Sequence, residues 1–427
     1  MTLTRDLISL FRINKLRNEW DNWLDDEATW RFINAVGSDS AFINIMDLEL
    51  AADFLPILFQ DFEFPSKESI GESEANNFLQ LLNKNMLINV SDYWIVIPLL
   101  NAEATQSIKI SDNISIVVGE REEKLKILSQ TMGLELREVM SRFVHTEKSR
   151  SPNFLKDPLL VIKINHQRRI VHENAVEIAY YTINFINVLY WGFIAPTHKA
   201  GNSKYFLRGE REKVNQHIVI QSFNNSNWGH RPLNFEYNCQ FNLDWLNENF
   251  YGSKLASLMN LISFKYQQNG LTNRFLRGIR FFVRGINVRS GHRFFDAESD
   301  AILLLNIASE CVLIKSQKER NKSRKIKGRL SKLGDIDEVS IESRKLIIEH
   351  MSNLRGSYVH EGHSNNVDSY LDGKEKLTEL EAYKKIVGRF LSKAFELTEK
   401  CRSQAVLEDI DIEEIWFLSF QDGENSS

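Results

Sequence analysis

The chain contains 427 residues, of which 43% are hydrophobic and 26% are charged. This is the composition of a globular protein, and it excludes a wholly disordered chain or a fibrous repeat. The net charge of −4 excludes a uniformly basic nucleic-acid-binding protein but permits a local basic surface. Three widely separated cysteines, Cys239, Cys311 and Cys401, argue against a disulfide framework and favour the reducing cytoplasm.

The first part of the chain is strongly acidic. Residues 1–80 contain 15 acidic and 6 basic residues, and their apolar residues recur at helical spacing, as in Leu48, Ala52 and Leu55. We therefore expect an acidic helical region over 1–85. No basic stretch followed by a long apolar run begins the chain, so we do not expect a signal peptide.

The next part alternates between strand-like and helix-like segments. Runs rich in β-branched and aromatic residues predict short strands at 93–100, 114–119, 159–164, 217–223 and 235–241. Apolar periodicity predicts helices at 121–145, 173–195 and 244–264. Together these segments predict an α+β regulatory or sensor domain over 86–268.

One apolar stretch, residues 178–195, contains no charged residue and is only just long enough to span a membrane. It includes the polar residues Thr182, Asn184 and Asn187, and its large apolar residues recur at helical spacing. These features favour a buried core helix, and we expect no membrane partner.

The last part, 269–403, has a helical pattern and a concentration of positive charge. Residues 274–293 contain six arginines and no acid, and 315–332 contain nine basic residues and one acid. A spacing alternating between three and four predicts that one helix face carries Lys315, Lys318, Lys322, Lys325, Arg329 and Lys332. We expect the basic segments 274–293 and 315–332 to hold an RNA backbone; the alternative for the stripe is a solvated helix face. Residues 404–427 form an acidic C-terminal tail.

The common cofactor and metal motifs are absent from the sequence. It contains neither of the glycine-rich loops that cradle phosphates, nor the G-x-S-x-G nucleophile elbow. His360 and His363 resemble a zinc-binding helix, but that motif needs the second histidine four positions after the first. We therefore expect neither a metal nor a cofactor.

Arg355 and His360 offer a chemistry that needs no metal. Cleavage of a phosphodiester requires stabilisation of charge on the phosphate oxygens, which a guanidinium supplies through its planar set of donors. It also requires a proton shuttle, and an imidazole titrates near neutral pH. A ribose 2′-OH can then act as the nucleophile.

The spacing of this pair is not specific by itself. Arg211/His217 and Arg344/His350 match the same loose pattern, about the number that chance predicts. Alone, Arg355 is also compatible with a surface ion pair and His360 with a helix-end residue. The surrounding segments distinguish this pair: an apolar helix with Glu310 near its end, a basic helix, an amphipathic helix ending in LRGSYVHEG, a polar loop and a long last helix.

This order resembles the HEPN domain, in particular its Apea-like subgroup, over residues 270–403 or about a third of the chain. The resemblance implies a C-terminal all-α helical bundle in which Arg355 and His360 are the catalytic pair and Glu310 is a supporting acid. It also implies a homodimer, because HEPN nucleases pair two copies around one cleft. Gly356 departs from the family, since many active members carry Asn, His, Lys or Ser after the arginine.

The expected protein is therefore of mixed class, with an N-terminal α+β region followed by an all-α HEPN bundle at 269–403. The resemblance implies a cytoplasmic, metal-independent endoribonuclease that acts as a triggered antiviral defence or toxin effector. Its partners would be RNA, with tRNA as one candidate, and a protein trigger sensed by the N-terminal region; Tyr358 and His363 would contact the RNA. The alternative is a non-catalytic HEPN module that binds RNA or protein.

Overall fold

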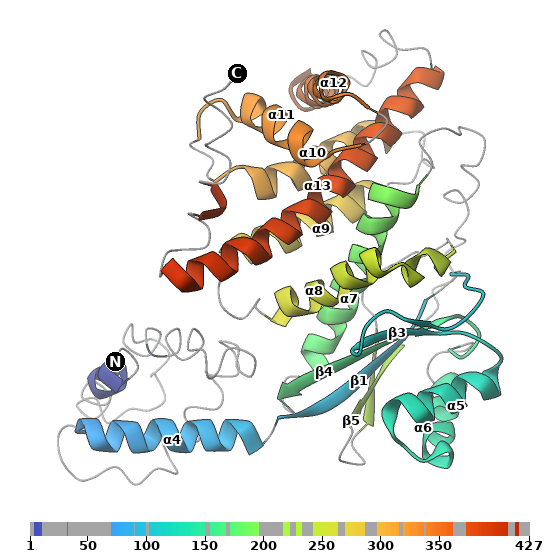
Figure 1. Ribbon diagram of the computed structural model, residues 1–427, viewed down its shortest axis with the longest axis vertical. Coiled ribbons are helices and arrows are strands. Elements are labelled where there is room, and N and C mark those ends of the chain that lie inside the picture. The colour runs from blue at the N-terminus through green and yellow to red at the C-terminus, as the bar shows by residue number, and fades with distance from the viewer. Residues whose placement is uncertain are drawn as a thin grey trace.

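The fold is mixed: a sheet with flanking helices comes first in the chain and a largely helical part follows, as Figure 1 shows. This confirms the predicted mixed class with a largely helical C-terminal part, whereas the assignment of that part to HEPN stays a prediction. The computed structural model describes residues 4–10, 32, 70–88, 90–99, 102–149, 154–167, 171–195, 217–222, 228–232, 242–263, 270–286, 297–315, 319–336, 339–361, 373–408 and 415–417.

Six strands form one sheet in the order β2-β3-β4-β1-β5-β6, and every neighbouring pair is antiparallel. Helix α4 (Glu72–Ile88) leads into the sheet. The strands are β1 (Val90–Pro98), β2 (Ile108–Lys109), β3 (Ile114–Val117), β4 (Leu159–Gln167), β5 (His217–Ser222) and β6 (Trp228–Pro232). Four of the predicted strands are thus present, β2 and β6 were not predicted, and 235–241 lies outside the described residues.

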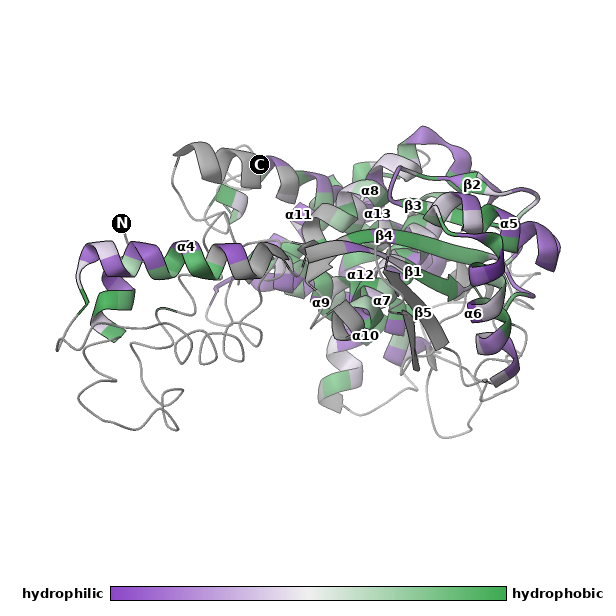
Figure 2. Cartoon of the chain, turned by 90° about the horizontal axis from the view of Figure 1, so that it is seen from below, coloured by the Kyte–Doolittle hydropathy of each residue, from purple (hydrophilic) through white to green (hydrophobic). Residues whose placement is uncertain are grey.

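Both faces of the sheet are buried, which explains why its central strands read as nearly continuous apolar runs. Side chains alternate between the two faces. On β1, Tyr93, Ile95 and Ile97 enter the large core shared with the helical part, whereas Trp94 and Val96 enter a smaller core. Figure 2 shows these mostly hydrophobic strands between helices.

The smaller core is closed by helices α5 (Arg121–Met132) and α6 (Leu136–Ser149). The sequence predicted one helix over 121–145, and that prediction is wrong because the chain turns at Gly133. Gly133 has a φ of 64°, and the N–H groups of Gly133 and Leu134 donate to carbonyls of the last turn of α5. A left-handed residue of this kind ends a helix, and glycine adopts it at least cost.

The apolar segment 178–195 lies in the large core. It forms the last part of α7 (Val171–Leu189) and a turn of π-helix (Tyr190–Ile194), and its central residues are buried. Thr182 and Asn187 satisfy their side chains by donating to carbonyls one turn earlier, at 2.7 and 3.0 Å. Among the described helices, none is long and apolar enough to cross a membrane.

The helical part follows a short 3₁₀ turn (Asp244–Asn247). It consists of α8 (Asn249–Ser263), α9 (Gly270–Ile286), α10 (Ala297–Leu313), α11 (Lys322–Leu333), α12 (Ile341–Glu361) and α13 (Gly373–Glu408). Gly192 of the π-helix crosses α13 at Gly388, where a Cβ on either glycine would lie 2.9 Å from the backbone of the other segment. Glycines therefore permit this backbone-to-backbone contact.

A single cluster of buried hydrophobic side chains extends from the sheet through α7 and α8 into α9–α13. This cluster crosses the predicted boundary at 268–269, so the helical part shares its core with the α+β region. The division of the chain into four domains stays a prediction. In the acidic tail, Ile415, Trp416 and Phe417 are buried, and the Trp416 indole donates to the Val312 carbonyl at 3.3 Å.

Candidate active site

Polar side chains connect helices α10 and α12, which run in opposite directions. Asp300, near the start of α10, meets the end of α12, and Asn306 meets its middle. We call these contacts the α10–α12 seam; they involve Asp300, Asn306 and Glu310 of α10 and Ser352, Arg355 and Tyr358 of α12. Such a polar seam contrasts with the apolar packing of α10 against α9.

The central contact of the seam joins Arg355 to Glu310 across 45 residues of sequence. Both terminal nitrogens of the guanidinium donate to the carboxylate: Nη1 to Oε1, and Nη2 to Oε2 at 3.2 Å. A helical side chain points back toward the N-terminus of its helix, which explains how Arg355 reaches Glu310. The side chains are 32% and 30% exposed, so the pair is open to solvent.

Two further bonds flank the Arg355–Glu310 pair. The Tyr358 hydroxyl donates to Oδ1 of Asp300 at 2.8 Å, which fixes the tyrosine ring against α10. Buried Asn306 donates to the Ile302 carbonyl at 2.9 Å and lies 3.4 Å from the Ser352 hydroxyl. The seam therefore holds the last turns of α12 by hydrogen bonds rather than by a deep apolar contact.

Tyr383 of α13 lies behind the seam and is completely buried. Burial is the main cause that raises the pKa of its hydroxyl; nearby Glu310 raises it further, whereas Ser309 and Arg355 lower it. The hydroxyl is close to Ser309 but makes no hydrogen bond of good geometry with a described residue. Its phenol is therefore neutral at any physiological pH and supports the site mainly through packing.

The last turns of α12 are open. Val359 is 53% exposed, and a Cβ added at Gly356 would meet nothing within 4 Å. His360 lies in the final turn of α12, but its side chain is outside the described residues, as is the whole of His363. The structure thus brings Arg355 and Glu310 together, places the His360 backbone five residues on, and holds Tyr358 on Asp300.

The C-terminus of α10 binds one arginine from each of the two basic segments, 274–293 and 315–332. Arg274 of α9 donates to the carbonyls of Ile314 and Lys315 at 2.7 and 2.6 Å. Arg329 of α11 donates to the Leu313 carbonyl at 2.6 Å. These are the carbonyls that a helix end leaves without partners, and cations there also oppose the helix dipole.

The prediction that the basic stripe follows one helix is wrong. Helix α10 ends at Leu313 and α11 begins at Lys322, after Asn321 with a φ of 57°. Lys315 therefore lies outside α11, and Lys318 lies outside the described residues.

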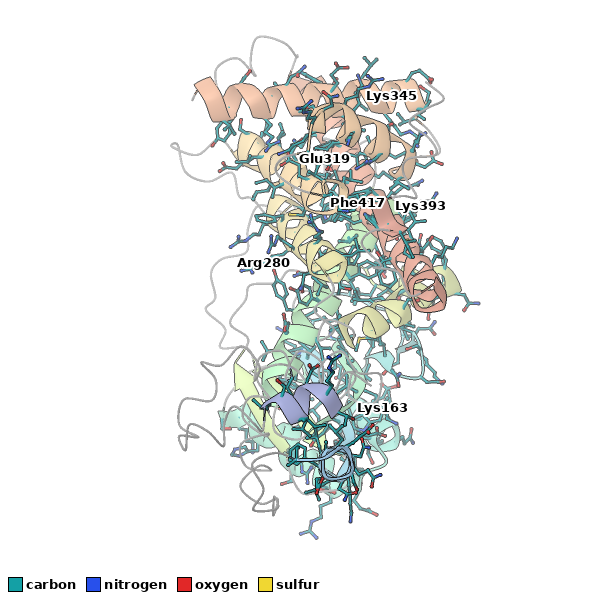
Figure 3. All side chains as sticks on the ribbon, turned by 90° about the vertical axis from the view of Figure 1, so that its left-hand side faces the viewer. Lys163, Arg280, Glu319, Lys345, Lys393 and Phe417 are labelled. Atoms are coloured by element: carbon teal, nitrogen blue, oxygen red, sulfur yellow. The ribbon has the colours of Figure 1, made fainter. Side chains whose placement is uncertain are left out.

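Part of the basic stripe contacts Glu319 instead of solvent. Burial would raise the pKa of Glu319, but bonds from the Lys325 ammonium and the Lys315 N–H outweigh it and lower the pKa. Arg329 is buried, and its guanidinium and the Lys315 ammonium each lie 6.0 Å from the centre of the Phe417 ring. Figure 3 labels Phe417. RNA binding by Lys315, Lys318, Lys322, Lys325, Arg329, Tyr358 and His363 stays a prediction.

The other arginine–histidine pair on α12, Arg344 and His350, makes contacts that stabilise the fold. Arg344 is buried and pairs with Asp335, and His350 Nδ1 lies 2.6 Å from Oε2 of Glu379 on α13. Both residues therefore tie α12 to neighbouring segments. Arg211 of the third pair lies outside the described residues.

Sequence reasoning missed the partners that position the site. Asp300 fixes Tyr358, and Tyr383 packs behind Glu310. Asp300 sits in the first turn of α10, where an acid is also explained by the helix dipole, so no local signal distinguished it. Within the described ranges, no group of three or more His, Cys, Asp or Glu side chains could hold a metal ion.

Comparisons of this chain with protein-family models, with curated proteins and with solved structures found no match.

Proposed function

We propose that the protein is a metal-independent endoribonuclease of the HEPN type, with Arg355 and His360 as its catalytic pair. The observation that supports this most is the two-point contact between Arg355 and Glu310. The resemblance names both residues, on separate helices and 45 positions apart, and the fold places them in contact. The Arg355 side chain is 32% exposed, which leaves part of the guanidinium accessible to a phosphate.

The proposed reaction uses the RNA's own 2′-OH. The 2′-oxygen attacks the adjacent phosphorus, the bond to the 5′-oxygen breaks, and the products are a 2′,3′-cyclic phosphate and a free 5′-OH. Arg355 stabilises the charge that develops on the phosphate oxygens, while His360 moves the proton. Glu310 orients the guanidinium.

The alternative is a non-catalytic HEPN module that binds RNA or protein. Glu310 favours it in one respect, because its two oxygens occupy two of the donors that Arg355 would offer to a phosphate. The open position at Gly356, where many active members have a polar residue, favours it as well.

The proposed biological context is a cytoplasmic defence or toxin effector held inactive until it is triggered. The acidic N-terminal part is the proposed restraint and the proposed sensor of a protein trigger. We further propose a homodimer in which two copies of the α12 end line one cleft. The exposed Val359 gives the end of α12 apolar surface that a second copy would cover.

The test is cleavage of total RNA by the purified full chain in EDTA. Cleavage that disappears in both Arg355→Ala and His360→Ala, with unchanged thermal unfolding, supports the nuclease. RNA that is bound but never cut supports the binding module. In cells, sequencing of RNA 5′ ends during induced expression would identify the target and show whether a cofactor of the cell is needed.

A further inference from the structure

Helix α9 presents a row of arginines to solvent. One face of the helix is buried in the large core through Leu271, Phe275, Ile279, Phe282 and Ile286. The outer face exposes Arg277, Arg280 and Arg284, which we call the α9 arginine ridge. Figure 3 shows Arg280 at the edge of the helical part. The helix contains no acidic residue.

Unlike Arg274 and Arg329, the ridge arginines do not bind the carbonyls at a helix end within the described residues. Arg274, one turn earlier in α9, donates hydrogen bonds from its guanidinium to carbonyls at the end of α10. In contrast, no hydrogen bond or ion pair joins the three ridge arginines to any residue of the described chain. Like charges three and four positions apart on a helix repel one another, so this arrangement slightly destabilises the free protein.

The ridge is held rigidly along α10. Gly278 and Gly285 allow α9 to approach α10 closely: added Cβ atoms would lie 3.1 Å from the Ala308 carbonyl oxygen and 3.3 Å from that of Ala301. Arg277 is close enough to Cys311 to oppose the rise in the pKa of that thiol, which burial causes. Cys311 follows Glu310 on α10, so this end of the ridge lies at the same level along α10 as the Arg355–Glu310 pair.

Aromatic side chains of α7 lie beside the ridge. Tyr181 is half-buried, and its ring meets that of Tyr180 edge to face at 5.2 Å. Burial, with Glu177 and Tyr180, raises the pKa of Tyr181 to about 12, while Arg280 and Arg277 lower it, which places both guanidinium groups near this phenol. Arginines that track a backbone, next to aromatic rings that can stack bases, are typical of surfaces for single-stranded nucleic acid.

We propose that the α9 arginine ridge binds the phosphate backbone of single-stranded RNA and leads it toward the α10–α12 seam. Guanidinium groups bind phosphate oxygens through paired donors. The ridge advances by about 5 Å per arginine, given a rise of about 1.5 Å per helical residue. The inference rests on the proposed function for the identity of the nucleic acid, but binding is measurable without cleavage.

The test is fluorescence anisotropy of a labelled single-stranded RNA with the full chain carrying His360→Ala, so that the probe stays intact. In this background we compare the ridge variant, Arg277→Gln/Arg280→Gln/Arg284→Gln, with a charge-matched variant near α11 that avoids the predicted RNA-binding residues, Arg320→Gln/Arg324→Gln/Lys345→Gln; we call these three residues the α11 set. The α11 set has no hydrogen bond or ion pair to another described residue, so both variants remove three uncommitted charges. Thermal unfolding checks that both are folded.

We expect the ridge variant to bind about tenfold more weakly at about 0.1 M salt and to have a salt slope shallower by about 2, since single-strand binding contributes about 0.7 per phosphate contact. The α11 variant should change affinity by less than about threefold. An unchanged salt slope in the ridge variant, or equal losses in both variants, overturns the proposal. Equal weakening of heparin binding, with no preference for RNA, overturns RNA as the ligand.

These outcomes separate the ridge from the catalytic proposal. Ridge-dependent RNA binding by a wild-type chain that never cuts RNA would leave the ridge in place and refute the nuclease. Cleavage by the wild type that is unaffected in the ridge variant would refute only the ridge.

Discussion

Helix α12 carries two arginine–histidine pairs of similar spacing, and the fold gives them different surroundings. Arg344 is 9% exposed and His350 is packed against Glu379, so the first pair fastens the helix to its neighbours. Arg355 lies in the second half of the same helix, at the α10–α12 seam, which is open to solvent. Spacing along a sequence therefore indicates which groups share a helix face, but it does not show whether that face is buried.

The largest difference should appear in catalysis. We expect Arg355→Ala and His360→Ala each to reduce RNA cleavage by about 10²–10⁴-fold, because they remove charge stabilisation or the proton shuttle. The matched control is His350→Ala, which should retain cleavage at a temperature where it is folded. Loss of cleavage in the control alone, with the other two variants active, would move the catalytic pair to the first half of α12.

The next largest difference should appear in stability. Asp335→Ala leaves the buried Arg344 guanidinium without its carboxylate, and we expect it to lower the free energy of unfolding by about 2–3 kcal/mol. Arg344→Met should cost less, because the 54% exposed Asp335 can be hydrated instead. Glu310→Gln, at the open pair, should cost less than about 1 kcal/mol. Urea denaturation measures all three, and a reversed order would mean that burial does not set these costs.

Another buried cation tests the same rule through pH. Lys254 of α8 is 6% exposed and lies 4.5 Å from the centre of the Phe250 ring, with Glu396 as its ion-pair partner. Burial, reinforced by Lys393, lowers its pKa to about 8. Between about pH 8 and 10.5 the unfolded chain holds this proton and the folded chain does not, so stability rises with pH in that window.

The measurement is urea denaturation of the wild type and of Lys254→Met at pH 7.5 and 9.5. We expect the wild type to gain stability at the higher pH relative to the variant. A parallel response of the two proteins would show that Lys254 keeps its proton through the contact with Glu396.

The smallest expected effect is at Tyr383. Its buried hydroxyl makes no hydrogen bond of good geometry with a described residue, so Tyr383→Phe removes no such bond and should change stability by less than about 1 kcal/mol. Cleavage should also be retained, because the ring that packs behind Glu310 remains. A large loss of cleavage in a folded Tyr383→Phe variant would assign the hydroxyl a part in the site.

The central strands were predictable because burial of both faces requires apolar residues at nearly every position. Both faces of β1 and β4 are covered, so nearly every position is apolar and the run ends where the polar turns begin. The break at Gly133 was also readable, since glycine marks helix ends, but the uninterrupted periodicity on either side concealed it. Helix α7 was correctly predicted as a core helix from its internal polar residues.

The candidate site was only partly predictable. Arg355 and Glu310 were chosen from the resemblance, and their roles stay a prediction; their contact joins residues 45 positions apart and could not be read from local sequence. The basic stripe failed because a spacing of three and four describes one continuous helix, and the turn at Asn321 divides it. Glu319 and the end of α10 then attract Lys325 and Arg329, and neither attraction can be inferred without the positions of distant carbonyls and carboxylates.

The sequence by itself determined the class of fold, the central strands and the apolar helices, and it indicated Arg355 and His360 as candidates for phosphodiester chemistry. These properties depend on local periodicity and on the intrinsic chemistry of side chains. The tertiary structure decided which charges are used internally and which are presented to solvent. The arginines of α9 and α11 look alike in sequence, yet Arg329 caps a helix and Arg280 faces outward. The reason is that the free energy of a charge depends on its burial and its partners, and both are set by segments far away in the chain.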